Sequence, residues 1–139
     1  MTNNPYVPCF YRVSVKALIY QDKKLLLVKE PNGKWELPGG GLEIGESFLS
    51  CLTREIKEEI GVNVTKMSSQ PIYTWPVVYK DAQNGNKPKL ILCFPVEVDS
   101  FDFKNDPEES IDIGFFSKEE IKIITLHPNF QELLKLLDN

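Results

Sequence analysis

Residues 40–62 read GGLEIGESFLSCLTREIKEEIGV, a glycine-rich segment that leads into an amphipathic helix. Four aliphatic residues recur at spacings of three and four, which predicts a helix over residues 47–60 with one buried stripe: Leu49, Leu52, Ile56 and Ile60. Ser47 is the predicted N-cap, and Gly61 is the predicted C-terminal stop. The helix therefore packs one face on a core and leaves its charged residues at the edge of that contact.

Three glutamates lie beside the apolar stripe. With a rotation of about 100° per residue, Glu55, Glu58 and Glu59 share one face that is about 100° wide. A solvated acidic face, with Arg54 paired to Glu58, is one interpretation. A site for a hard cation is the other, because Mg²⁺ takes oxygen ligands alongside substrate phosphates. The preceding glycines favour the second interpretation, since they let the backbone approach a ligand closely.

The spacing of Gly40, Gly45 and Ser47 imitates the phosphate-binding P-loop, G-x-x-x-x-G-K-[ST]. Glu46 stands where that motif needs a lysine, and a carboxylate repels the phosphates that the lysine would hold. The sequence therefore excludes a P-loop nucleotidase.

Length and composition predict a single domain over residues 1–139, with 42% hydrophobic and 26% charged residues. One histidine and three widely spaced cysteines exclude multi-histidine metal sites, C-x-x-C zinc centres and a disulfide framework: Cys9, Cys51 and Cys93. Cys51 and Cys93 are predicted core residues. Unpaired cysteines suit a reducing compartment, and no apolar run is long enough to span a membrane, so we expect a cytoplasmic protein.

Carboxylates gather in two windows of an otherwise basic chain. Residues 36–59 hold six acids and two bases, a net charge of −4, and residues 97–120 hold nine acids and two bases, a net charge of −7. The remaining segments carry a net charge of +7. This distribution disfavours a uniform basic face for duplex nucleic acid, and it suits divalent cations and small anionic ligands.

Segments of alternating or continuous apolar character predict the strands, which lie at about residues 13–19, 25–28, 62–67, 72–79, 89–98 and 111–116. The polar segment 81–87, which contains Asn84-Gly85, predicts a hairpin between two of them. A final helix is expected to start near Pro128. This order predicts an α/β fold in which helices pack on a central mixed sheet.

The segment 40–62 resembles the Nudix box, G-x5-E-x7-R-E-U-x-E-E-x-G-U, in which U is a bulky aliphatic residue. All nine constrained positions match, and Ile56 and Val62 occupy the aliphatic places. The preceding segment, Trp35-Glu36-Leu37-Pro38-Gly39-Gly40, is similar to the lead-in of that family. The resemblance implies an α/β/α sandwich and a hydrolase that cleaves a nucleoside diphosphate linked to another moiety, with Mg²⁺ as cofactor and Mn²⁺ as a substitute.

The resemblance also implies roles for residues of the box. Glu58 and Glu59 would be the main metal ligands, and Glu55 would be a ligand or the general base that deprotonates water. Arg54 would orient these carboxylates, and the Gly39 carbonyl would complete the coordination shell.

Two further acids have open roles. For Glu46, support of the loop and contact with metal are about equally expected. Glu109, six residues before Phe115, is similar in position to a family glutamate that acts as ligand or general base. Glu108 and Asp112 compete with it, and a solvated loop acid is the alternative for each.

The sequence signals for substrate-binding residues are the least specific ones in this chain. Arg12, Lys16 and Lys29 are surface cations that could meet phosphates. Tyr79 lies on an alternating aromatic strand and could stack on a base or pack in a core or a dimer interface. His127, just before Pro128, is expected to have a surface or capping role.

Several substrates remain open: a nucleoside triphosphate, a dinucleoside polyphosphate or a nucleotide sugar. The expected partner is a small nucleotide, with no duplex nucleic acid and no membrane, and a homodimer is left open. The alternative function is a non-catalytic Nudix-fold module that binds a nucleotide. Such modules usually lose a box glutamate, whereas this chain keeps Glu55, Glu58 and Glu59.

Overall fold

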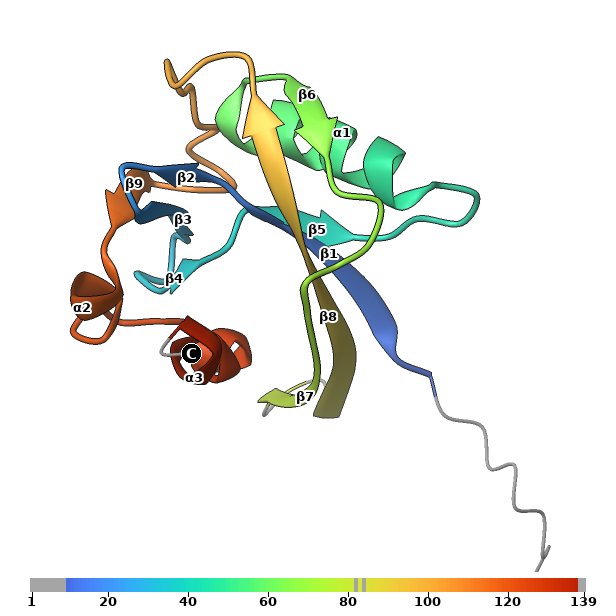
Figure 1. Cartoon of the computed structure of the whole chain (residues 1–139). Coiled ribbons are helices and arrows are strands. Elements are labelled where there is room, and N and C mark those ends of the chain that lie inside the picture. The colour runs from blue at the N-terminus through green and yellow to red at the C-terminus, as the bar shows by residue number, and fades with distance from the viewer. Residues whose placement is uncertain (1–9, 82, 84, 138–139) are drawn as a thin grey trace, which may run out of the picture.

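The computed structural model describes residues 10–81, 83 and 85–137 (Figure 1). Cys9 and the predicted hairpin residue Asn84 lie outside the described residues. Among the described helices, none is long and apolar enough to cross a membrane.

The first sheet is built on the predicted hairpin. Strands β7 (Tyr73–Asp81) and β8 (Gly85–Val98) pair antiparallel. β8 also pairs in parallel with β1 (Arg12–Leu18) and antiparallel with β6 (Val64–Met67). The sheet is therefore mixed, as the sequence predicts.

A second, antiparallel group of strands surrounds β3 (Lys24–Lys29). Its members are β2 (Tyr20–Gln21), β4 (Trp35–Glu36) and β9 (Asp112–Phe116). The chain passes from the first group to the second directly, because β2 begins two residues after β1 ends.

Helix α1 (Phe48–Ile60) carries the box and has the predicted ends. The Ser47 side chain accepts the backbone N–H of Ser50, and Gly61 adopts a left-handed conformation with φ of 75°. At such a φ a residue with a Cβ atom is strained, so glycine suits this stop.

Helices cover both sides of the strands (Figure 1). On one side, Leu52, Ile56 and Ile60 of α1 pack against alternate residues of β1 and β8, such as Val15, Ala17 and Phe94. Leu49, which was also predicted for the buried stripe, is 53% exposed, because it lies in the first turn of the helix. On the other side, Leu18, Ile91 and Cys93 of the same strands meet residues from the C-terminal part of the chain. Because successive side chains of a strand point to opposite faces, this alternation produces an α/β/α arrangement. Cys51 and Cys93 are buried free thiols, as predicted.

The C-terminal segment starts differently from the prediction. Its first turn at Pro128–Phe130 is a 3-10 helix, η1, and α3 (Gln131–Leu137) follows; a short helix α2 (Lys118–Ile121) precedes both. The glycine-rich segment is also not entirely a loop, since Gly39–Gly41 forms strand β5 on the edge of β1. A Cβ atom at Gly40 would lie 2.5 Å from the carboxylate of Glu55, so this close approach requires glycine.

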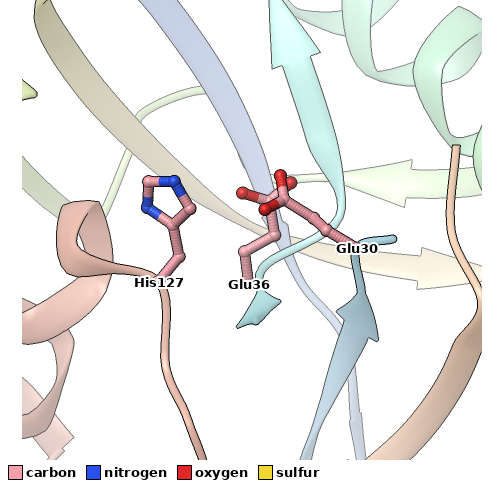
Figure 2. A group of neighbouring side chains, drawn as sticks. All are labelled: Glu30, Glu36 and His127. Atoms are coloured by element: carbon pink, nitrogen blue, oxygen red, sulfur yellow. The ribbon is translucent and has the colours of Figure 1, made fainter. Parts of the chain in front are cut away.

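Lys16, predicted for the surface, is buried, and of the two roles predicted for His127 the structure shows the capping one. Lys16 is only 5% exposed, because it lies within β1 between two core residues. His127 is 9% exposed, and its side chain caps η1 as predicted. The segment before η1 places His127 beside Glu30 and Glu36 from the β3–β4 region (Figure 2).

Candidate active site

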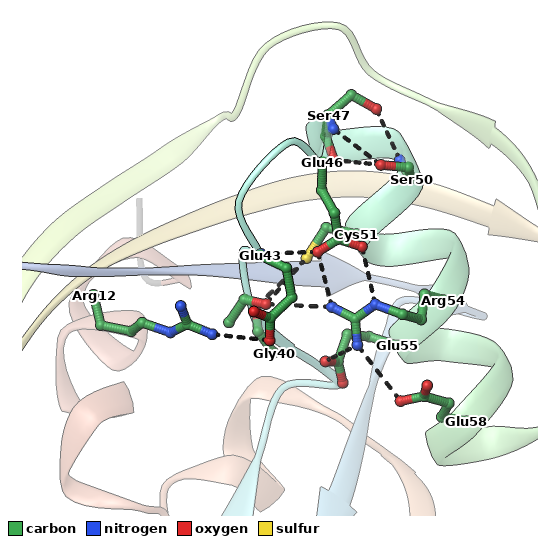
Figure 3. A network of polar contacts seen from close by, with 11 residues as sticks. Arg12, Gly40, Glu43, Glu46, Ser47, Ser50, Cys51, Arg54, Glu55 and Glu58 are labelled. Atoms are coloured by element: carbon green, nitrogen blue, oxygen red, sulfur yellow. Dashed lines mark hydrogen bonds and ion pairs between the residues drawn. The ribbon is translucent and has the colours of Figure 1, made fainter.

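Arg54 joins the acids of the box and the loop before it (Figure 3). Its Nε and Nη2 donate to the two carboxylate oxygens of Glu46, each at 2.9 Å. Its Nη1 donates to Glu55 Oε1 at 2.8 Å and lies 3.5 Å from Glu58 Oε2. The predicted orienting position of Arg54 therefore corresponds to direct contacts with Glu46, Glu55 and Glu58.

The carboxylate of Glu46 already accepts hydrogen bonds from Arg54 and from the glycine-rich segment. Besides the paired hydrogen bonds from Arg54, Oε1 accepts the backbone N–H of Glu43 at 2.8 Å. These bonds from Arg54 and from Glu43 lower the pKa of Glu46 to about 2. Of the two open roles for Glu46, the contacts favour support of the loop.

Glu59 is the buried member of the acidic face, with 7% exposure. Its Oε2 accepts the backbone N–H of Gly39 at 3.2 Å. Burial raises the pKa of Glu59 to about 8, against the opposing effect of Lys16. The structure thus brings Glu59 and Gly39 into direct contact, two residues that the resemblance assigns to one metal ion.

Glu109 lies on the loop between β8 and β9 and approaches the same face. Partial burial raises its pKa, and the nearby carboxylates of Glu58, Asp106 and Glu55 raise it further. The loop thereby brings Glu109 close to α1 across a large sequence separation. The competitor Asp112 accepts the N–H of Ile113 at 2.8 Å.

This set of donors fits a hard divalent cation. Glu55, Glu58 and Glu59 are carried by α1, and Glu109 on the β8–β9 loop lies near enough for the charges of Glu58 and Glu55 to raise its pKa. All are oxygen donors, which Mg²⁺ and Mn²⁺ prefer. Arg54 offsets the charge of only part of the set, and the mutual repulsion of the rest is a cost that a bound cation would relieve.

The predicted substrate-binding residues occupy three different places. Arg12 reaches Glu43 on the glycine-rich segment, at 3.3 Å. Lys29 lies over the ring of Trp35, at 5.8 Å from its centroid. The ring of Tyr79 packs against His127, with centroids 5.3 Å apart.

A second group of polar residues was not predicted as a site. They line a cavity of about 230 Å³ that borders Gly39–Gly41. One member, Lys16, donates from Nζ to the carbonyls of Leu37 at 3.2 Å and Gly39 at 3.1 Å, and it lies 3.7 Å from Glu36 Oε1. The sequence held one signal for this site, namely a lysine inside an otherwise apolar alternating strand, where a charge is costly unless it is paired.

Comparisons with known proteins agree with the site and the fold. A model of the NUDIX domain matches residues 10–137. The chain is 27% identical over 129 residues to the RNA pyrophosphohydrolase of Orientia tsutsugamushi (strain Boryong), covering 88% of this chain and 72% of that protein. It is 40% identical over 68 residues to the ADP-ribose pyrophosphatase of Methanocaldococcus jannaschii, covering 46% of this chain and 40% of that protein.

A solved structure supports the same conclusion. The MutT NUDIX hydrolase from Burkholderia pseudomallei has a TM-score of 0.74 and 25% identity, over 91% of this chain and 97% of that one. The family match spans both the box helix and the strands that flank it. The protein is therefore an enzyme of the Nudix hydrolase family.

Proposed function

We propose that this protein is a Mg²⁺-dependent pyrophosphohydrolase that cleaves a nucleoside diphosphate linked to another moiety. One observation carries the proposal: Arg54 orients Glu55 and Glu58 at 2.8 and 3.5 Å, beside the buried Glu59 and the approaching Glu109. Such a complete set of carboxylates suits a divalent cation that binds phosphates.

In this proposal, Glu55, Glu58 and Glu59 hold the cation. The Gly39 carbonyl, which the resemblance also assigns to the cation, accepts a hydrogen bond from Lys16 Nζ at 3.1 Å instead. When bound, Mg²⁺ would neutralise the phosphate charge and lower the pKa of a water molecule that it holds. Water forms a bond to one phosphorus, the anhydride P–O bond breaks, and the proton from water passes to a carboxylate of Glu55 or Glu109. Arg54 keeps its carboxylate partners in place, and Arg12 and Lys29 are the proposed cations for outer phosphate oxygens.

The alternative is a Nudix-fold module that binds a nucleotide without cleaving it. The intact set of Glu55, Glu58 and Glu59 favours the enzyme, because a binding module has no need for so many mutually repelling carboxylates. We further propose that the chain forms one domain, acts in the cytoplasm and takes a small nucleotide as its substrate.

The test is a panel of nucleotides incubated with Mg²⁺, with Mn²⁺ in parallel, and scored for release of phosphate, pyrophosphate or nucleoside monophosphate. The panel holds nucleoside triphosphates, dinucleoside polyphosphates, nucleotide sugars and an RNA with a 5′-triphosphate. We expect hydrolysis of at least one member that EDTA abolishes. Tight binding of one member without any release would favour the binding module instead.

Glu109→Gln tests the assignment of the general base. If Glu109 accepts the proton of water, the variant should lose about 10²-fold to 10⁴-fold in kcat, with a smaller change in KM. The acid limb of the pH–rate profile should also disappear. Measurement of kcat and KM from pH 5 to pH 10 checks this, with Glu119→Gln, at an exposed position of α2, as the control. A loss below threefold with an unchanged acid limb would leave Glu55 as the base.

A further inference from the structure

A pocket of about 440 Å³ lies at the end of the sheet where strands β1 and β8 begin side by side (Figure 1). Two short segments line it, residues 10–12 at the start of β1 and residues 87–89 within β8. We call it the strand-end pocket and define it by six residues: Phe10, Tyr11, Arg12, Lys87, Pro88 and Lys89.

Positive charge gathers at the strand-end pocket. Among the described residues that line it, three are basic and none is acidic. The register of the sheet places Arg12 directly beside Lys89 on the neighbouring strand, and like charges in such a position destabilise a sheet. Lys87 lies on the same face of β8 as Lys89, because side chains two residues apart in a strand point the same way. A bound polyanion would remove this repulsion.

The surroundings of the pocket leave its cations available to an anion. Arg12 lies 3.3 Å from Glu43, but both side chains are more than half exposed, and ion pairs of this kind are weak. Burial lowers the pKa of Lys89, and the charges of Lys16 and Lys87 lower it further, against the carboxylates of the cavity beside Gly39–Gly41. A negative ligand is therefore favoured over a cation at this end of the sheet.

Aromatic rings are exposed beside these cations. Phe10 is 84% exposed and Tyr11 is 45% exposed, so both leave apolar surface in contact with water. Contiguous exposed apolar surface often marks a binding site. Aromatic side chains next to lysine and arginine are typical of proteins that hold unpaired nucleic-acid strands, because the rings stack on bases while the cations meet phosphates. The combination favours a ligand that carries flat rings and repeated negative charges.

Other partners match fewer of these features. A neutral proline-rich peptide would use the aromatic rings but not three cations, and an acidic peptide would use the cations but offers few flat rings. A membrane surface suits a projecting amphipathic helix, whereas this site is a hollow between two strands. A second copy of the chain would bring the same cations to the pocket, and these repel one another.

The form of the nucleic acid follows from the exposed rings. A base can stack on Phe10 or Tyr11 only when it is free of its own neighbours, and a duplex keeps its bases stacked inside. Loops and ends of RNA present such unpaired bases, which proteins commonly bind by stacking. The features of the pocket therefore favour single-stranded RNA.

The strand-end pocket also adjoins the candidate active site. Lys89 lines both this pocket and the cavity beside Gly39–Gly41. A Cβ atom at Gly41 would meet the guanidinium of Arg12, whereas one at Gly40 would meet the carboxylate of Glu55. The short strand β5 therefore lies between Arg12 and the glutamates of the box (Figure 3). A strand whose terminal nucleotide lies at these glutamates would continue into the strand-end pocket.

We propose that the strand-end pocket binds single-stranded RNA, with phosphates held by Arg12, Lys87 and Lys89 and with bases stacked on Phe10 and Tyr11. This inference goes beyond the proposed function, because hydrolysis of a small nucleotide requires no contact at this end of the sheet. It is also independent of catalysis, since a strand without a cleavable end has the same bases and phosphates.

The test is fluorescence anisotropy of a 3′-labelled single-stranded RNA of about 12 nucleotides with a 5′-hydroxyl end, measured in EDTA. Phe10→Ala should raise Kd about fivefold to 100-fold, which corresponds to the loss of one stacked base. Lys87→Gln should lower the slope of log affinity against log salt concentration by about 0.7, because one fewer phosphate is neutralised. The matched controls are Ile123→Ala, at a residue that is also 84% exposed, and Lys66→Gln on β6; each should leave Kd within about twofold.

Several results would overturn the proposal. These are no saturable binding of the RNA by the wild-type protein up to about 100 μM at about 0.1 M salt, and affinities of Phe10→Ala and Lys87→Gln equal to those of the controls. Tighter binding of duplex RNA, or of a DNA strand of the same sequence, would contradict unpaired RNA as the occupant. Without RNA binding, Phe10-dependent binding of anionic phosphatidylserine vesicles or Phe10-dependent dimerisation in light scattering would assign the pocket to that partner. Since these assays contain no divalent metal and no phosphoric anhydride, their failure leaves the hydrolase proposal standing, and failure of hydrolysis leaves the RNA result standing.

Discussion

Replacing Glu58 by Gln is expected to lower kcat for Mg²⁺-dependent hydrolysis by about 10³-fold or more, with little change in stability. A carboxylate ligand that positions a catalytic cation contributes several kcal/mol to transition-state stabilisation, and each ~1.4 kcal/mol corresponds to a factor of ten. Glu58 is 51% exposed, and its ion pair with Arg54 at 3.5 Å is a helical i, i+4 contact. Pairs of this kind contribute about 0.3–0.5 kcal/mol, so the fold should persist.

Steady-state kinetics on the best substrate of the panel measure the loss, and urea denaturation measures the free energy of unfolding. Glu119→Gln, at an exposed position of α2, is the matched control and should keep full activity. Wild-type turnover by the Glu58→Gln enzyme would show that Glu58 is not a metal ligand. Loss of activity together with loss of the folded state would point to a structural role.

Replacing Lys16 by Met is expected to lower the free energy of unfolding by about 3–5 kcal/mol, the usual cost of breaking a buried ion pair from one side. The variant removes a buried cation that donates to the carbonyls of Leu37 and Gly39 and lies 3.7 Å from Glu36. The carboxylates of Glu36 and Glu59 then lose the opposite charge that offsets their burial.

The contribution of Lys16 to stability should be constant from about pH 6 to pH 7, because its neighbour Glu59, whose pKa burial raises to about 8, ionises mainly above that range. Burial would by itself lower the pKa of Lys16, but the surrounding carboxylates together outweigh burial and raise it: Glu36, Glu59, Glu30 and Glu55. Since the pKa is raised on folding, the stabilisation is complete below the unfolded value of about 10.4 and is lost as pH rises through the folded value.

Urea denaturation of the wild-type and Lys16→Met proteins at pH 6 and pH 7, in EDTA, tests both statements. Lys66→Met on strand β6, where the lysine is exposed, is the control and should change stability by less than about 0.5 kcal/mol. A Lys16→Met effect no larger than this control would contradict the role of Lys16. A large difference between the two pH values would contradict its full ionisation.

The parts of the fold that sequence alone predicted are governed by local rules. The α1 helix follows from a period of 3.6 residues and from caps at Ser47 and Gly61, which act within one turn of the chain. The hairpin of β7 and β8 follows from alternation around a turn. The shared face of Glu55, Glu58 and Glu59 is a consequence of helical geometry once the helix is known.

Other features depend on which strands pair. The burial of Lys16 required β1 to lie between β5 and β8, and the short strand at Gly39–Gly41 exists because β1 offers it an edge. The proline at position 128 starts a 3-10 turn before α3, a local detail that apolar spacing does not distinguish.

Residues 40–62 by themselves determined the family, the box helix and the acidic face, because the information in this segment is local and periodic. Only the tertiary structure showed which residues line the polar cavity beside Gly39–Gly41, since Glu30, Glu36, His127 and Asn129 have no common spacing in the sequence. Their meeting is set by the pairing of β3 with β4 and by the bridge between Trp35 and Leu126. Long-range strand pairing of this kind is not encoded in any single segment.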